Sequence, residues 1–347
     1  MSQFHILTIS DIQRLTAQSV VLSFEIPDFV KKDFLFQAGQ YITLKATVNG
    51  TEVRRAYSLC SAPDANTIQV GVKAVEGGTF SVYANEQLKV GNTLEVNSPE
   101  GKFILNTEVQ DKTYVAFAAG SGITPILSMI KTALQTTNNK FVLVYGNKQP
   151  EEAMFRDALL ALREKYPHRL SIEWIYSQNR EDGAHFGRIS KPTVNFVVKN
   201  KYASHDFDSF YLCGPEAMIK EVTSVLAENG ISESKILFEL FTASDAETVA
   251  ETLEGTSQVT IIVDDERHEL PINQESIILD AVLEADIDPP YSCQGGICSS
   301  CIARVTEGTA VMQKNQILTD KEIAAGLILT CQAHPTSAKV VVDYDNV

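Results

Sequence analysis

The first part of the chain alternates short runs of β-branched and aromatic residues with turn-forming pairs such as Asn49-Gly50 and Gly77-Gly78. Several short strands separated by turns are typical of an antiparallel barrel. We therefore expect an antiparallel β-barrel over residues 1–108. Its strands are predicted over Val20–Ile26, Tyr41–Val48, Ile68–Val75 and Thr93–Val96.

From residue 109 onward, predicted strands alternate with predicted helices. This alternation is typical of a parallel, doubly wound sheet, so we expect an α/β domain over residues 109–242. The expected strands are Tyr114–Ala119, Phe141–Tyr145, Ser171–Tyr176, Ser209–Cys213 and Lys235–Leu240. The expected helices are Pro125–Leu134, Pro150–Tyr166 and Pro215–Asn229.

The segment 243–257 is small, polar and acidic, which predicts an interdomain linker, although Ala246–Leu253 could form a short helix. Beyond it, Gln258–Val263 and Glu266–Ile272 predict a hairpin, and Ser276–Ala285 predicts a helix. A third domain is therefore expected over residues 258–347.

Four cysteines in this last domain have a distinctive spacing. Cys293, Cys298 and Cys301 form C-x4-C-x2-C, and Cys331 follows after 29 intervening residues. This is the ligand spacing of a plant-type [2Fe–2S] ferredoxin, and small residues such as Gly295 let the backbone wrap closely around a cluster. A zinc site would favour two C-x2-C pairs, and a disulfide framework suits small secreted domains. The spacing therefore predicts a one-electron carrier, and the resemblance to plant-type ferredoxins implies an α+β, β-grasp-like fold.

Charge and composition narrow the classes of protein further. The net charge is −15, and residues 243–347 contribute 18 acidic against 5 basic residues. No basic stripe could neutralise phosphates, so nucleic acid is not an expected partner. The most apolar stretch, Tyr114–Ile130, is interrupted by glycines and a proline, and the N-terminus does not match a signal peptide. We expect a cytoplasmic protein with no membrane partner. The acidic last domain either steers the protein toward a basic docking patch on a partner or only keeps the domain soluble.

The segment Arg55-Ala56-Tyr57-Ser58 lies on a predicted strand. It resembles the flavin signature R-x-Y-S of the ferredoxin–NADP reductase superfamily. The resemblance implies that Tyr57 lies against the flavin ring, that Ser58 forms a hydrogen bond to the ring edge and that Arg55 supplies a cation near the flavin phosphates. A second segment resembles the family's other flavin element and implies FAD, with backbone N–H groups at a helix start facing the pyrophosphate. It comprises Val72, Lys73, Gly78, Thr79, Phe80 and Ser81.

The turn Gly120-Ser-Gly122-Ile-Thr124-Pro125 connects a strand to a helix and has the G-x-G-x-x-P form found in the same family. The resemblance implies that Gly120, Gly122 and Pro125 meet a nicotinamide dinucleotide and that Thr124 touches the flavin. Further residues also match family elements near the nicotinamide and the flavin ring. These are Cys213-Gly214-Pro215, Glu239 and Phe241, with Ser58, Cys213 and Glu239 as the expected catalytic residues.

Ser177 and Arg180 follow a strand where the family distinguishes its coenzymes. A serine and an arginine suit a 2′-phosphate and favour NADPH, while the neighbouring Glu181 and Asp182 leave NADH open.

The order of flavin barrel, nucleotide domain and ferredoxin domain resembles reductase components of multicomponent oxygenases. The resemblance implies an NAD(P)H-dependent oxidoreductase that passes electrons through FAD and a [2Fe–2S] cluster to a multisubunit oxygenase, above all one of the phenylacetyl-CoA epoxidase kind. Reductases that serve ketosteroid hydroxylases or hybrid-cluster proteins share the layout, so those acceptors stay open. A non-catalytic redox-sensing module is the alternative from another functional class.

Overall fold

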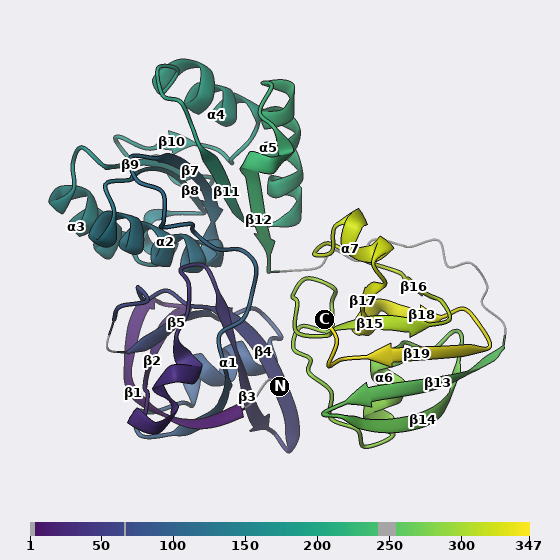
Figure 1. Cartoon of the computed structure of the whole chain (residues 1–347). Helices are drawn as coiled ribbons and strands as arrows, with labels where there is room; N and C mark the ends of the chain where they lie inside the picture. The colour runs from purple at the N-terminus through teal and green to yellow at the C-terminus, as the bar shows by residue number, and fades with distance from the viewer. Residues whose placement is uncertain (1–3, 66, 242–254) are drawn as a thin grey trace. The chain divides into compact units, whose positions relative to one another are not determined.

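The computed structural model describes residues 4–65, 67–241 and 255–347. The chain divides into two compact units, one made mainly of residues 4–241 and the other mainly of the residues after 241 (Figure 1). Each unit has its own sheets and hydrophobic cores, so we describe the two units separately.

The first unit begins with a curled six-stranded sheet, ordered β4-β3-β6-β1-β2-β5. An isolated bridge between Leu59, just after β4, and Val70 on β5 joins its two edges, which confirms the expected antiparallel barrel. Helix α1 (Thr79–Glu86) and a 3-10 helix (Asp28–Phe34) accompany the sheet. The strands are β1 (Phe4–Thr16), β2 (Ser19–Glu25), β3 (Tyr41–Val48), β4 (Thr51–Ser58), β5 (Ile68–Lys73) and β6 (Thr93–Asn97).

Strand β1 was not expected from the sequence pattern. Its centre alternates the buried Leu7 and Ile9 with exposed residues, but beyond Ile9 a register irregularity and polar side chains interrupt the alternation. A strand with one solvated face and a bulge has a weak hydrophobic signal, because only every second residue contributes to the core.

The second sheet of this unit is parallel throughout its described pairs, in the order β10-β9-β8-β7-β11-β12. Helices α2 (Ile123–Thr136) and α3 (Arg156–Lys165) cover one face, and α4 (Lys191–Asn195) and α5 (Glu216–Glu228) cover the other (Figure 1). This confirms the doubly wound α/β prediction. The strands are β7 (Thr113–Ala119), β8 (Lys140–Asn147), β9 (Leu170–Tyr176), β10 (His185–Phe186), β11 (Ser209–Gly214) and β12 (Ile236–Leu240).

The single helix expected over Pro150–Tyr166 is wrong in one respect. A 3-10 turn (Pro150–Glu152) is separated from α3 by Phe155, which adopts a left-handed conformation with φ 59°. The buried Met154 and Phe155 pack into the core here, and the carbonyl oxygen of Met154 lies 3.4 Å from the Tyr145 hydroxyl oxygen. Tertiary packing therefore overrides local helix propensity at this position.

The second unit contains a five-stranded mixed sheet in the order β14-β13-β19-β15-β17 and a two-stranded sheet of β16 and β18. The predicted hairpin is confirmed, and the predicted helix is the shorter α6 (Ile278–Glu284), which packs beside the sheet together with a smaller helix α7 (Asp320–Ala324) (Figure 1). The strands are β13 (Thr256–Val263), β14 (Glu266–Asn273), β15 (Ile302–Glu307), β16 (Ala310–Met312), β17 (Leu327–Leu329), β18 (Ala333–Pro335) and β19 (Lys339–Asp343).

Most of the expected linker, residues 243–254, and the short helix considered for Ala246–Leu253 lie outside the described residues. Strand β13 begins at Thr256, within the range expected for the linker. Among the helices that the structure describes, none is long and apolar enough to cross a bilayer.

Candidate functional site

The order of the parallel sheet reverses between β7 and β11, and ligands of doubly wound sheets bind at the carboxyl ends of such strands. The turn after β7 contains Gly120, with φ 55°, and Gly122. A Cβ on Gly122 would lie 2.1 Å from the carbonyl oxygen of Cys213 at the end of β11. Because only glycine permits this approach, the glycine-rich turn and the Cys213-Gly214 segment form one continuous backbone edge.

The three expected catalytic residues include two in direct contact. The Ser58 hydroxyl donates a hydrogen bond to Glu239 Oε2 at 2.9 Å, and Glu239 is the register partner of Cys213 across β12 and β11. Burial raises the pKa of Glu239 to about 8, against the smaller lowering effect of the Ser58 hydrogen bond. Burial, followed by the nearby Glu239, raises the pKa of the Cys213 thiol well above its usual range. At neutral pH the site therefore holds a protonated carboxyl group and an uncharged thiol.

The flavin-signature residues occupy the second half of β4. Tyr57 is half-buried and packs against the ring of Phe80, with ring centroids 5.5 Å apart. Arg55 is exposed, and its guanidinium donates to the Arg54 carbonyl at 2.7 Å. Ser58 is buried at the strand end, so the strand carries an aromatic ring, a cation and a hydroxyl along its length. Ala56 lies between them, half-buried.

In the second flavin segment, Gly78 and Thr79 form the start of helix α1, and Thr79 is exposed. Ser81 is buried instead, and its hydroxyl accepts a hydrogen bond from the backbone N–H of Val75 at 3.2 Å. Phe80 belongs to the barrel core. An anion at this helix start would therefore meet Gly78 and Thr79, whereas Ser81 shapes the preceding turn.

The remaining residues of this segment lie on β5. Val72 is buried in the barrel core, and Lys73 Nζ lies 3.6 Å from Glu152 Oε2. Near the glycine turn, Thr124 and Pro125 are buried in the first turn of α2, whereas Pro215, before α5, is exposed. Phe241 follows β12 and packs against the core of the nucleotide domain.

The expected coenzyme-discriminating residues follow β9. Ser177 is half-buried, and its backbone N–H donates to the Asn147 carbonyl. The Arg180 guanidinium lies over the ring of Phe186, 4.6 Å from its centroid. The adjacent Glu181 is paired with Arg156 at 2.7 Å, so its negative charge is locally compensated.

The loop of the second unit brings the four cysteines together. Cys298, Cys301 and Cys331 are buried, and Cys293 is half-buried. The pKa of Cys293 is lowered because its sulfur accepts hydrogen bonds from the thiols of Cys298 and Cys331. The backbone N–H of Gly295 also donates to this sulfur at 3.3 Å. Converging thiols with backbone N–H donors fit a [2Fe–2S] cluster and its thiolate ligands.

One residue of the site that sequence reasoning missed is Tyr145. Its hydroxyl, at the carboxyl end of β8, donates to the Gly120 carbonyl at 2.9 Å and so supports the glycine turn. Burial raises the pKa of this hydroxyl. A tyrosine at the end of an otherwise apolar strand is a usable signal, because a buried hydroxyl requires an acceptor.

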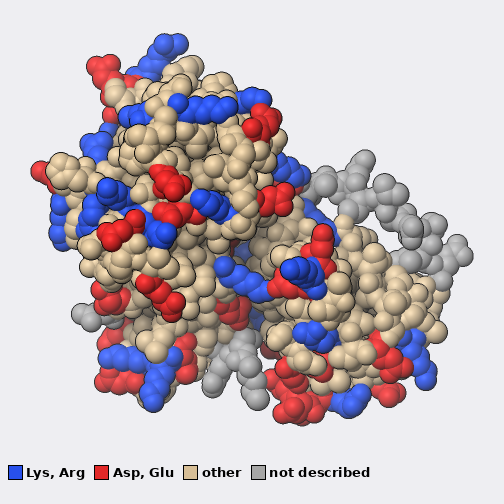
Figure 2. Space-filling model, turned by 45° about the horizontal axis from the view of Figure 1, so that its top comes forward, with Lys and Arg blue, Asp and Glu red and all other residues tan. Residues whose placement is uncertain are grey.

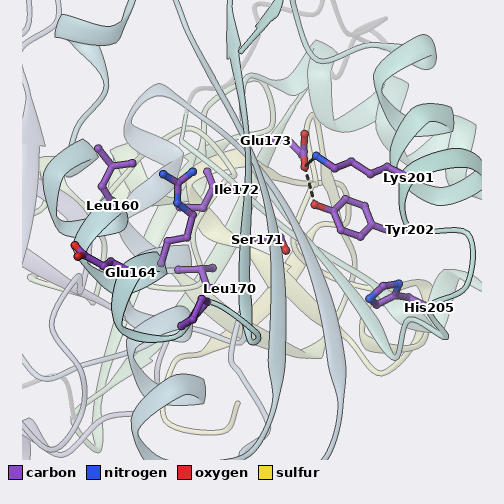
Figure 3. A pocket seen from close by; sticks show the side chains of 11 residues that line it. Leu160, Glu164, Leu170, Ser171, Ile172, Glu173, Lys201, Tyr202 and His205 are labelled. Atoms are coloured by element: carbon purple, nitrogen blue, oxygen red, sulfur yellow. Dashed lines mark hydrogen bonds and ion pairs between the residues drawn. The ribbon is translucent and has the colours of Figure 1, made fainter. Parts of the chain in front are cut away.

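A cavity of about 870 Å³ lies elsewhere in the nucleotide domain, along the first half of β9 (Figure 3). Within it, Glu173 accepts hydrogen bonds from Lys201 and Tyr202, both at 2.6 Å. These partners and His185 offset the cost of burying the carboxylate and lower the pKa of Glu173. The expected coenzyme residues follow the opposite end of β9, so this cavity does not belong to the site described above.

Comparison with known proteins matches three families in succession. The oxidoreductase FAD-binding domain matches residues 6–104, the oxidoreductase NAD-binding domain residues 117–224, and the 2Fe-2S iron-sulfur cluster binding domain residues 261–336.

Two curated relatives cover nearly the whole chain. One of the subunits of 1,2-phenylacetyl-CoA epoxidase from Escherichia coli (strain K12) is 37% identical, with 99% of both chains aligned. The ferredoxin reductase component of 3-ketosteroid-9-alpha-monooxygenase from Rhodococcus rhodochrous is 32% identical, over 98% of this chain and 96% of the relative.

Among solved structures, phthalate dioxygenase reductase, described as modular for electron transfer from pyridine nucleotides to [2Fe–2S], shares the fold. It has a TM-score of 0.62 and 24% identity, with 98% of each chain covered. The three domain matches and the full-length relatives agree with the glycine turn, the flavin strand and the four converging thiols. The chain therefore belongs to the family of FAD-, NAD- and [2Fe–2S]-binding oxidoreductases that includes the reductase components of multicomponent oxygenases.

Proposed function

We propose that this enzyme takes electrons from NADPH, or from NADH, and delivers them through FAD and its [2Fe–2S] cluster to a multisubunit phenylacetyl-CoA epoxidase. The observation that carries the proposal is the contact between the flavin strand β4 and the end of the parallel sheet. There, Ser58 is hydrogen-bonded to Glu239, which lies beside Cys213. Nicotinamide supplies a two-electron hydride, flavin accepts it and releases electrons one at a time, and a plant-type cluster carries single electrons.

We assign the coenzyme pyrophosphate to the edge formed by Gly120, Gly122 and Gly214. Gly122 lies so close to the Cys213 carbonyl that a side chain would not fit between them, so only backbone atoms line this edge. Pro125, in the first turn of α2, costs no hydrogen bond, because the first N–H groups of a helix have no intrahelical acceptor. These residues would hold the coenzyme by N–H groups and the positive end of the helix.

We assign the catalytic positions to Ser58, Cys213 and Glu239. The uncharged thiol and the protonated carboxyl place no negative charge beside a developing nicotinamide cation or a flavin that receives a hydride. The hydrogen bond from Ser58 fixes the orientation of Glu239, so both side chains are preorganised. Their role is to position the two rings and to exclude water.

We assign the flavin phosphates and ring to β4 and the start of α1. Arg55 supplies a cation, Tyr57 supplies a ring face, and the helix that starts at Thr79 supplies the N–H groups of its first turn. Phe241 and Thr124 complete the proposed flavin surroundings from the nucleotide domain. Cys293, Cys298, Cys301 and Cys331 are the proposed cluster ligands.

Coenzyme choice is expected to depend on Arg180. Its planar group rests on Phe186, and Arg156 compensates the neighbouring Glu181, so the Arg180 guanidinium is available to a 2′-phosphate beside the exposed Asp182. Arg180→Ala should raise the KM for NADPH by about 10- to 100-fold, the value of one charged hydrogen bond, and leave that for NADH nearly unchanged. Steady-state ferricyanide reduction with each coenzyme measures this.

The control for coenzyme choice is Arg163→Ala, which removes an exposed arginine from α3. It should alter neither KM. Equal increases for NADPH and NADH in Arg180→Ala would place the selecting residue elsewhere.

The identity of the acceptor rests on sequence similarity and charge together. The relative named as part of an epoxidase is more similar to this chain than the ketosteroid monooxygenase component. Exposed acidic residues such as Glu284 and Asp286 precede the cysteine loop. Figure 2 shows acidic side chains, with some basic ones between them, along the lower edge of the unit formed by the last third of the chain.

Coupled turnover with a phenylacetyl-CoA epoxidase oxygenase should therefore fall markedly as ionic strength rises, because salt screens steering between oppositely charged proteins. Ferricyanide reduction by the same enzyme should change little over that range. Salt-independent coupled turnover would contradict electrostatic docking. Electron transfer to a ketosteroid hydroxylase or hybrid-cluster protein in place of the epoxidase would contradict the proposed acceptor.

We also propose a cytoplasmic location, where thiols remain reduced for iron binding, and domain limits of 1–108, 109–242 and 258–347. The non-catalytic sensor is set aside, because the full-length relatives are reductase components or oxygenase subunits.

A further inference from the structure

Helix α2 carries a polar stripe among its buried apolar residues. Thr124, Ser128 and Lys131 are spaced four and three residues apart, so their side chains share one face of the helix. Ser128 is fully buried. Buried polar side chains are costly unless they are hydrogen-bonded, so this stripe needs partners.

Those partners are two consecutive carbonyl groups on the chain that leaves the flavin strand. The Ser128 hydroxyl donates to the Ser61 carbonyl at 2.6 Å, and Lys131 Nζ donates to the Cys60 carbonyl at 2.9 Å. Cys60 lies two residues after Ser58, the last residue of β4. Two side chains of one helix therefore hold the segment that immediately follows the flavin signature.

Lys131 is an unusual choice for this contact. Burial lowers the pKa of its ammonium group, and no ion pair joins it to a carboxylate in the part of the chain that the structure describes. The ammonium group of this partly buried lysine thus donates to a backbone carbonyl. Charge-assisted hydrogen bonds are stronger and shorter than neutral ones, so this contact resists displacement.

The same helix also touches the barrel through its first turn. A Cβ on Gly71 of β5 would lie 2.9 Å from Cγ2 of Thr124, so β5 and α2 approach more closely than side chains normally allow. Helix α2 begins directly after the Gly120–Gly122 turn. One rigid helix therefore connects the turn proposed for the coenzyme with the segment that follows Ser58.

We propose that Lys131 and Ser128 are positioning residues for hydride transfer, which hold the flavin strand at a fixed distance from the coenzyme turn. The inference rests on the proposed assignment of these two segments to FAD and the coenzyme. The reaction transfers a hydride, one proton with two electrons, which oxidises the coenzyme and reduces the flavin. Its rate depends steeply on the separation of the two rings, because misplacement by about 1 Å can cost about 100-fold.

The test compares Lys131→Met, which keeps the aliphatic stem and removes the donor, with Lys131→Arg, which keeps a cationic donor. Anaerobic stopped-flow reduction of the bound FAD at saturating NADPH or NADH gives the hydride-transfer rate constant. Lys131→Met should lower this constant by about 10- to 100-fold with the coenzyme Kd within about twofold of the parent protein, and Lys131→Arg should retain most of it. Ser128→Ala should lower it as well.

A second readout does not use activity. The hydrogen bonds from Ser128 and Lys131 to the carbonyls of Ser61 and Cys60 form a clamp on this segment. Hydrogen–deuterium exchange of the protein as purified should become faster in residues 57–62 of Lys131→Met, because half of the clamp is lost. The control is Lys140→Met, the same substitution at an exposed lysine that begins β8. It should change neither exchange in 57–62 nor the rate constant.

The clamp is disproved if Lys131→Met transfers hydride at the parent rate, or if Lys131→Arg is as slow as Lys131→Met. A lower melting temperature of Lys131→Met with an unchanged hydride-transfer rate would show that Lys131 has only a structural role. Failure of the parent protein to reduce its FAD with either coenzyme would refute the proposed function instead. The exchange experiment would still decide whether the clamp exists.

Discussion

Replacing Cys298 with serine is expected to abolish reduction of an oxygenase or of cytochrome c while NAD(P)H-dependent ferricyanide reduction remains. Cys298 is one of four converging thiols, and its buried sulfur donates to Cys293. Serine is a poor ligand for a cluster whose irons prefer thiolate. Ferricyanide takes electrons directly from the flavin, so its reduction does not require the second unit. Iron content, the visible spectrum and parallel assays with the two acceptors measure the result.

Gln294→Asn is the matched control for the cysteine loop. Gln294 is exposed in the same loop with φ 52°, a backbone conformation that asparagine tolerates. This variant should keep its cluster and both activities. Loss of ferricyanide reduction in a folded, FAD-replete Cys298→Ser protein would show that electrons do not leave the flavin independently of the cluster.

Gly122→Ala is expected to lower kcat/KM for NADPH and NADH by about 100-fold or more. The added methyl group would lie 2.1 Å from the Cys213 carbonyl oxygen, which is far inside contact distance, and the atom in its way is backbone. The turn or the end of β11 must therefore shift, and the shift moves the edge on which the coenzyme is proposed to lie. Stopped-flow flavin reduction and coenzyme Kd measure the loss.

Gly146→Ala provides the comparison for this glycine. Gly146 is in β8 of the same sheet, and a Cβ there would press on the Ile189 side chain, at 3.2 Å, and would be in ordinary contact with the Ala118 carbonyl oxygen, at 3.8 Å. A small effect is expected, because this side chain can move by a few tenths of an ångström. If Gly122→Ala binds and oxidises both coenzymes as the parent does, the close approach at β11 has no part in coenzyme binding.

The coenzyme turn illustrates how much a local pattern contains. Gly120, Gly122 and Pro125 were predicted to connect a strand to a helix, and the structure has β7 before them and α2 around Pro125. The reason is that a turn with positive φ followed by a first-turn proline is specified by a few adjacent residues. What this pattern does not contain is the partner of Gly122, because Cys213 lies about 90 positions further along the chain.

The break at Phe155 illustrates the opposite case. The residues around it have the composition of a continuous helix, yet Met154 and Phe155 pack into the core and the helix begins only at Arg156. Likewise, β1 and the small strands around the cysteine loop were not predicted, because short or half-solvated strands have little periodicity. Long-range packing selects these structures from several that the local sequence permits.

The sequence by itself determined the three successive folds, the four-cysteine spacing and the residue types of the flavin and coenzyme segments. Each of these depends on residues close together in the chain, or on a ligand count that spacing alone reveals. Only the tertiary structure decided that Ser58 bonds to Glu239, that Glu239 is protonated at neutral pH and that Lys131 holds the Cys60 carbonyl. Hydrogen-bond partners and pKa values arise from burial and from contacts between distant segments, which a linear pattern does not specify.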